Sequence, residues 1–240
     1  MQIALLRVGI DSGVAGIQGP LFKDFRFEYL PIPDRFRQKG VDSRTYGNTA
    51  GRLGIRFVNY FPEHLRQKYC QTPIHYDPEF ETFTYGDPTP PKRRLRRLQA
   101  GDLLVFYAGL QGWGWRREPS LYIIGYFEVE LAGIASQFSR RQLTRYFAKN
   151  FHVRHQPVFE DQKDCLILVK GGKGSRLLEK AFLISCLSKD CAGRPLKVLS
   201  PAMCQVFGDF AGHTSIQRSP PRWVNEDFGD RAAAFVRSLA

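Results

Sequence analysis

The sequence lacks the segments that would place it in or across a membrane. In its 240 residues no apolar run approaches the roughly 20 residues that span a bilayer. The start, MQIALLRVGIDSG, has no basic region before its apolar stretch and no A-x-A cleavage site. It is typical of a β-strand and not of a signal peptide. We therefore expect a cytoplasmic protein without a membrane partner.

Cysteine is scarce and irregularly spaced. The five cysteines form no CxxC pair, and Cys186 and Cys191 lack the second close pair that a zinc knuckle needs. A disulfide framework is unusual in a cytoplasmic chain of this length. We therefore predict five reduced thiols: Cys70, Cys165, Cys186, Cys191 and Cys204.

Several enzyme motifs are also missing. The sequence has no G-x-S-x-G elbow, no cysteine–histidine pair typical of a nucleophile and no GxxxxGK[ST] phosphate loop. His152 and His155 lie three residues apart without a matching acid, so they form no metal signature; no metal ligands are predicted, and the cofactor stays unknown. No repeat or linker divides the chain. We expect residues 1–240 to form a single domain, and the oligomeric state stays open.

Positive charge is what the sequence has in excess. Its 35 lysines and arginines outnumber 23 acidic residues, for a net charge of +12. Such a surplus attracts polyanions, of which nucleic acid is the commonest inside a cell. DNA or a nucleotide is therefore the expected partner. The alternative is a basic surface that serves only solubility.

Two segments concentrate this charge. The first, KRRLRR, directly precedes a predicted strand, and the second has no acidic residue from Leu131 to Phe159. Within the second, Ser139 can cap a helix over residues 139–150 with a basic face. We predict that both segments contact phosphates, although each could equally be a solvated surface paired with acids elsewhere. The candidate residues are Lys92, Arg93, Arg94, Arg96, Arg97, Arg141, Arg145 and Lys149.

The strongest β signal comes from two neighbouring stretches. GDLLVFYAGL and SLYIIGYFEVEL are rich in β-branched and aromatic residues, and the loop between them suits a hairpin. Another strand is predicted at IALLRVGI, and helices are predicted over residues 62–68, 139–150 and the C-terminal tail. Together these elements predict an α/β (α+β) fold with a β-rich core and flanking helices.

Ionisable residues recur at every second position in the run IHYDPEFE. If this run is extended, His75, Asp77, Glu79 and Glu81 all point to one face. Such carboxylates suit general acid–base catalysis or, without further histidine ligands, a weak divalent-metal site. Asp77, Glu79 and Glu81 are therefore candidate catalytic residues. The alternative is an acidic strand face that pairs with the basic tract, and Pro78 interrupts a regular strand.

A glycine-rich turn lies in LVKGGKGSRLLEKA. The pattern predicts a strand, a turn and a helix, whose first backbone N–H groups could bind a phosphate. A tight turn that binds no ligand is the alternative. The candidate phosphate-binding residues are Lys170, Gly172, Lys173 and Ser175.

Several motifs together resemble a known family. They are RVGIDSG, DSRTYGN, DPEFETFTYGDPT followed by GDLLVFYAGL, YIIGYFEVE and LVKGGKGSRLLEKAF. This set, which covers most of the chain, is similar to the third nucleotide modification associated domain family. That family is inferred to work with modified bases in phage and prokaryotic DNA, so the resemblance implies a role in DNA base modification.

The two central strands are also similar to those of EVE, ASCH and other PUA-like barrels, which hold a flipped or exposed base in a small pocket. This likeness implies a PUA-like barrel component, with Tyr107 and Tyr126 near the pocket. Arg44 and Tyr46 are further pocket candidates, since with Asp42 and Ser43 they lie in a turn-rich stretch of the kind that often carries sites.

Three classes of function follow from these patterns. The first is a nucleic-acid-binding or nucleotide-binding protein that recognises a base, modified or not, beside a basic surface. The second is an enzyme that acts on a nucleotide or modified base through Asp77, Glu79 and Glu81. The third is a basic protein that docks an acidic partner.

Overall fold

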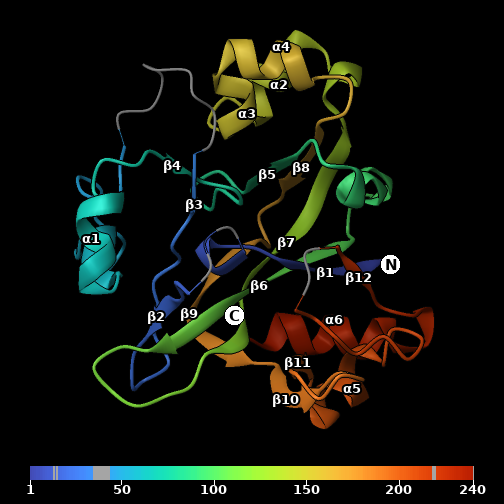
Figure 1. The fold of residues 1–240 in the computed structure, drawn as a ribbon. Coiled ribbons are helices and arrows are strands. Elements are labelled where there is room, and N and C mark those ends of the chain that lie inside the picture. The colour runs from blue at the N-terminus through green and yellow to red at the C-terminus, as the bar shows by residue number, and fades with distance from the viewer. Residues whose placement is uncertain (13, 15, 35–43, 218–219, 240) are drawn as a thin grey trace.

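The computed structural model describes residues 1–12, 14, 16–34, 44–217 and 220–239. Asp42 and Ser43, which belong to the turn-rich stretch near the predicted base pocket, lie outside the described residues. The rest of the chain forms a mixed α/β structure on one large sheet, as the sequence predicts (Figure 1).

A long hairpin forms the centre of this sheet. Its strands, β6 (Leu103–Gly112) and β7 (Ser120–Ile134), pair antiparallel, from Leu103 opposite Glu128 to Leu110 opposite Ser120. The first eight residues of β6 are all buried, so both faces of the strand are covered. A strand covered on both faces needs apolar residues on both, which explains its continuous apolar sequence. The predicted strand pair is confirmed.

Shorter strands follow the outer edges of the hairpin. β1 (Ile3–Arg7) and β2 (Gly19–Leu21) run parallel to β6, one after the other along its edge. β8 (Ile167–Gly171) and β9 (Arg176–Leu183) line the edge of β7 in the same way, both antiparallel to it. The hairpin therefore supports strands that come from widely separated parts of the chain.

The sheet ends in two further strands. β12 (Arg222–Trp223) pairs with β1, and β5 (Thr84–Asp87) pairs with β8, so both ends of the chain contribute to one sheet. Two small sheets accompany it. They are β3 (Ile32–Pro33) with β4 (Ile74–His75), and β10 (Ser185–Lys189) with β11 (Pro195–Leu199).

Helices gather at two ends of the sheet. In Figure 1, α2, α3 and α4 lie at the end near β5 and β8, whereas α5 and α6 lie at the opposite end beside β10 and β11. The α-helices are α1 (Glu63–Tyr69), α2 (Arg140–Tyr146), α3 (Phe151–Arg154), α4 (Gln156–Gln162), α5 (Pro201–Phe207) and α6 (Gly229–Ser238). The 3₁₀ helices are η1 (Ile10–Ser12), η2 (Phe57–Tyr60), η3 (Pro90–Arg97), η4 (Ala135–Gln137) and η5 (Glu226–Phe228). No helix in the described ranges combines the length and apolar character of a membrane span.

Ser139 caps α2 as predicted, through a capping box with Gln142. The helix ends at Tyr146, earlier than expected, because Asn150 begins a separate short helix, α3, by accepting the N–H of His152. The five cysteines are free thiols, also as predicted. The three-helix end of the molecule thus consists of short helices, of which α2 and α3 have side-chain N-caps.

The predicted helix after the glycine turn is wrong. The segment from Arg176 to Leu183 is β9, although leucine, glutamate, lysine and alanine are good helix formers. Pairing with β7 satisfies its backbone groups, and Leu178 and Ala181 enter the core. Tertiary pairing overrides the local preference, so the turn precedes no helix N-terminus.

The run from His75 to Glu81 is not the single extended strand that its alternation predicts. β4 ends at His75, and the Asp77–Pro78 peptide bond is cis. Glu79 and Thr84 then exchange backbone hydrogen bonds and close a tight turn before β5. Because the chain turns within this run, its acidic side chains do not share one face.

Candidate functional site

The segment from His75 to Glu81 contributes side chains to two clefts. The first, here called the Asp77 cleft, has a volume of about 490 Å³ and is lined by His75, Asp77 and His152 among others. The second, the Glu79 cleft, has a volume of about 580 Å³ and is lined by Tyr76, Glu79 and Glu81 among others. Both volumes fall in the range of small-molecule sites, roughly 300–1,000 Å³.

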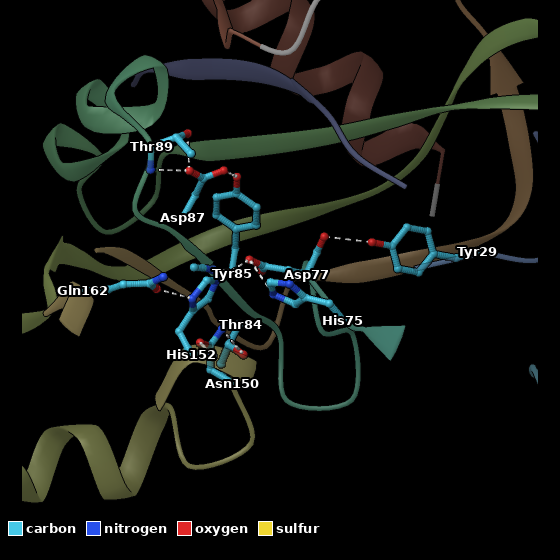
Figure 2. A network of polar contacts seen from close by, with 11 residues as sticks. Tyr29, His75, Asp77, Thr84, Tyr85, Asp87, Thr89, Asn150, His152 and Gln162 are labelled. Carbon is cyan, nitrogen blue, oxygen red and sulfur yellow. Dashed lines mark hydrogen bonds and ion pairs between the residues drawn. The ribbon is translucent and has the colours of Figure 1, made fainter. Parts of the chain in front are cut away.

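A buried cluster of one carboxylate and two imidazoles forms part of the wall of the Asp77 cleft (Figure 2). Asp77 Oδ2 lies 3.5 Å from His152 Nε2 and 3.8 Å from His75 Nε2. One possible ligand atom from each residue lies within 4.8 Å of the other two. His75 ends β4, Asp77 follows it in the chain, and His152 comes from α3, so only folding assembles this group.

Hydrogen bonds hold Asp77 from two sides. Its Oδ1 accepts the backbone N–H of Gly86 in β5 at 2.9 Å, and its backbone carbonyl accepts the Tyr29 hydroxyl at 2.9 Å. These contacts leave Oδ2 as the oxygen that faces the histidines. The carboxylate orientation is therefore set by groups outside the cluster.

The two imidazole rings are also held in place. His152 Nδ1 lies 2.8 Å from Gln162 Oε1, and its backbone N–H donates to Asn150 Oδ1 at 3.1 Å. The His75 ring stacks on Phe151, with ring centroids 3.7 Å apart and an interplanar angle of 25°. Because packing and hydrogen bonds restrict both rings, the cluster is preorganised.

Burial shifts the protonation of the cluster. It raises the pKa of Asp77 to about 6, and the hydrogen bond and charge of His152 oppose this rise. Burial also lowers the pKa of His75 well below its ordinary value, with smaller contributions from His152 and His155. Perturbed titratable groups in a cleft are typical of functional sites.

The basic tract 92–97 borders this cleft. It forms η3, whose Lys92 is buried and lines the cleft together with Thr89. Burial lowers the pKa of Lys92, while the charges of Asp87 and Asp77 oppose the shift. The tract's four arginines are exposed on the same short helix: Arg93, Arg94, Arg96 and Arg97. The fold thus places Lys92 in the cleft wall and leaves the four arginines of the same 3₁₀ helix exposed.

The three predicted catalytic carboxylates are divided between the two clefts. Glu79 closes its own turn by accepting the N–H groups of Glu81 and Thr82 and the Thr82 hydroxyl. Glu81 is exposed and pairs with Lys149 at 3.2 Å. Only Asp77 joins histidines, so the three do not form one catalytic set.

The second basic segment contributes His152 to the Asp77 cleft, but its three predicted phosphate-contacting residues do not line that cleft. Arg141 and Arg145 are exposed on α2, and Lys149 lines the Glu79 cleft. The two predicted basic surfaces therefore border different features of the molecule.

Three of the four predicted base-pocket residues are core side chains. Tyr107 and Tyr46 are fully buried, and their hydroxyls donate to the carbonyls of Ile216 and Pro31. Tyr126 is also buried. Arg44 borders the Glu79 cleft, where its guanidinium lies 4.8 Å from the centroid of the Tyr76 ring.

The predicted phosphate loop packs against β7. Ser175 is buried, and its hydroxyl accepts the N–H of Glu128 at 3.1 Å. The Lys170 ammonium donates to the Gly171 carbonyl, and the Glu128 carboxylate occupies the space beside Gly174. With a carboxylate at that position, the loop containing Lys170, Gly172, Lys173 and Ser175 does not present the expected anion cradle.

Gly86 is expected to be intolerant of a side chain. A Cβ at this position would lie 2.9 Å from His152 Cδ2 and 3.1 Å from Asn150 Oδ1. Gly86→Ala should therefore lower the free energy of unfolding by about 1–3 kcal/mol, as overpacking does, and displace His152. Urea unfolding measures this loss.

Gly172→Ala is the matched control, because its nearest neighbour would lie at an ordinary 3.5 Å. Equal stability losses in the two variants would contradict the close approach of Gly86 to His152.

Sequence reasoning found His75 and Asp77, which alternate along one run, but it missed His152 because that residue lies far from them in the chain. In the sequence, His152 has His155 as its neighbour and no acid nearby. The acid comes from Asp77 through tertiary structure.

A family model described as nucleotide modification associated domain 3 matches residues 2–238, and no curated protein or solved structure matches the chain.

Proposed function

The chain belongs to the nucleotide modification associated domain 3 family, and on that premise we propose that it modifies a nucleotide bound in the Asp77 cleft. The observation that carries this proposal is the buried His75–Asp77–His152 cluster in a cleft bordered by an arginine-bearing helix. A cleft of about 490 Å³ is large enough for a small-molecule substrate.

The two parts of this region suit two parts of a nucleotide. The exposed Arg93, Arg96 and Arg97 are placed to contact phosphates, which position a substrate without reading its base. The cluster in the cleft wall is placed to meet the base or sugar. If the substrate is DNA, the target nucleotide would have to leave the base stack to reach the cluster.

Convergence of the cluster favours chemistry over recognition alone. Three groups that can accept or donate protons, or bind a cation, meet in the wall of the cleft. Their orientations are set by surrounding groups such as Gly86 and Gln162. Preorganised groups of this kind are what a reacting centre requires.

The Glu79 cleft supports a second candidate function, recognition of a base. It combines the aromatic residues Tyr76, Phe57 and Phe80 with Arg44 and Arg154, a mixture that suits stacking of an exposed base.

A PUA-like component, a single domain and a cytoplasmic location stay predictions.

Asp77→Asn is expected to abolish nucleotide modification while keeping the fold, because the asparagine Oδ1 can still accept the Gly86 N–H. Nucleosides from the DNA, RNA and nucleotide pool of expressing cells are compared by mass spectrometry. The wild-type chain should raise or lower the amount of at least one nucleoside. With the variant, the change in that amount should be at least about 100-fold smaller.

Glu226→Gln is the matched control, because Glu226 is an exposed carboxylate that lines neither cleft. It should behave as the wild type. The proposal fails if Asp77→Asn leaves the same nucleoside profile as the wild-type chain.

A further inference from the structure

We propose that His75, Asp77 and His152 bind a divalent transition-metal ion in the Asp77 cleft. This inference deepens the proposed function by naming a cofactor class for the same cleft, and it rests on that function for the ion's role. The metal site itself is argued from the positions of three donor atoms and the groups that orient them.

The donor spacing matches a three-ligand metal site. An ion about 2.0–2.2 Å from each donor in tetrahedral geometry places the donors about 3.4 Å apart. Asp77 Oδ2 lies 3.5 Å from His152 Nε2 and 3.8 Å from His75 Nε2. The rings of His75 and His152 meet at a steep angle of 71°, so they are not stacked on each other. Small side-chain shifts bring the three donors to bonding distance.

The contacts around His152 indicate which of its ring nitrogens would meet an ion. Gln162 Oε1 lies 2.8 Å from Nδ1, and an oxygen there accepts the Nδ1–H. His152 Nε2 lies 3.5 Å from Asp77 Oδ2, where an Nε2–H donates to the carboxylate when no ion is present. An ion at this position would take the place of the Nε2 proton, while Gln162 keeps the proton on Nδ1.

Asp77 is also oriented by a hydrogen bond from outside the donor set. Its Oδ1 is engaged by the Gly86 N–H, so Oδ2 is the oxygen available to an ion. His75 is buried, and stacking on Phe151 fixes the orientation of its ring. Each donor is thus oriented by a neighbour outside the set, as in established metal sites.

The donor types select the class of ion. Two imidazoles and one carboxylate suit Zn²⁺ or Fe²⁺, whereas Mg²⁺ and Ca²⁺ prefer oxygen ligands. Three protein ligands also leave at least one coordination position open, and here it would face the cleft that holds the substrate. An open position is typical of catalytic rather than structural sites.

The test uses the untagged, full-length chain after treatment with EDTA. Co²⁺ is titrated as the probe, because nitrogen and oxygen ligands in low-symmetry geometry give it a visible absorption band. We expect one ion per chain, displaced by Zn²⁺, with an anaerobic Fe²⁺ titration to compare the two candidate ions. Asp77→Asn and His152→Gln should each weaken Co²⁺ binding at least about 100-fold.

Two further variants separate binding from folding. Gln162→Leu removes only the outer partner of His152 and should weaken Co²⁺ binding about 10–100-fold. His64→Asn changes an exposed histidine on α1 that is not among the three donors, and it should bind Co²⁺ as the wild type does. Zn²⁺ should raise the melting temperature of the wild type and His64→Asn but not that of His152→Gln.

The inference is overturned if the wild type shows no one-to-one Co²⁺ band, or if the donor variants bind Co²⁺ as well as His64→Asn does. Nucleotide and DNA binding are measured separately in EDTA. If Co²⁺ binds and no nucleotide or DNA does at low salt, the proposed function fails while the metal site stands. If nucleotide binds and Co²⁺ does not, only the metal site fails.

Discussion

Replacing Arg93, Arg96 and Arg97 together by alanine is expected to weaken single-stranded DNA binding on the order of 100-fold at low salt. Each exposed guanidinium that contacts a phosphate contributes about 1 kcal/mol or more, and releases a counterion from the strand. Losing three such contacts should make the salt dependence shallower, so that the negative slope of log K against log salt decreases in magnitude by about two. Fluorescence anisotropy of a labelled oligonucleotide across a salt series measures both changes.

Arg94 is left in place, because its guanidinium lies 4.4 Å from the centroid of the Trp223 ring and contributes to packing. The matched control replaces three exposed arginines on α2, Arg140, Arg141 and Arg145, with alanine. That variant loses the same charge but no side chain beside the Asp77 cleft. If both triple variants lose affinity equally, DNA responds to the overall charge, and the location of the binding surface beside the cleft is refuted.

Phe106→Ala is expected to cost about 3–5 kcal/mol of unfolding free energy, the largest effect of a single substitution among those considered. Phe106 is fully buried in β6 and packs on Phe127, with ring centroids 4.6 Å apart, and on Tyr85 at 6.0 Å. Its removal leaves a cavity between the central hairpin and β5. For a chain of this size the melting temperature should fall by roughly 10 °C or more.

The same substitution should also disturb the Asp77 cleft. Phe80 packs edge-on against Phe106 at 5.6 Å and Phe127 at 5.7 Å, so it anchors the segment that carries Asp77 to the sheet. Leu187→Ala provides the control, because Leu187 is an exposed apolar residue in β10. A melting temperature unchanged in Phe106→Ala, or lowered equally in Leu187→Ala, would contradict this packing arrangement.

Local sequence determined the elements whose stability comes from neighbouring residues. The β6–β7 hairpin follows from two aromatic and β-branched runs joined by a glycine-rich loop. Ser139 and Gln142 specify the start of α2 through reciprocal hydrogen bonds only three residues apart. The net positive charge and the clustering of arginines in residues 92–97 are likewise properties of composition, and the fold keeps those arginines exposed.

Tertiary structure decided the elements whose local preferences were overridden. Residues 176–183 contain good helix formers, yet they become β9 because β7 offers unpaired backbone groups along its edge. The alternation from His75 to Glu81 predicts one strand, yet a turn closed by Glu79 divides its acids between two clefts. Tyr46 and Tyr107 enter the core because their hydroxyls find buried carbonyls there.

The candidate site depends most on the tertiary structure. Sequence alone determined that this chain carries isolated histidines and carboxylates, a basic tract and a β-rich core. The fold decided that Asp77 meets His152, which follows it far along the chain, and that η3 lies beside them. The physical reason is that a buried carboxylate requires partners within a few ångströms, and spacing along the chain does not determine distances in space once strands pair.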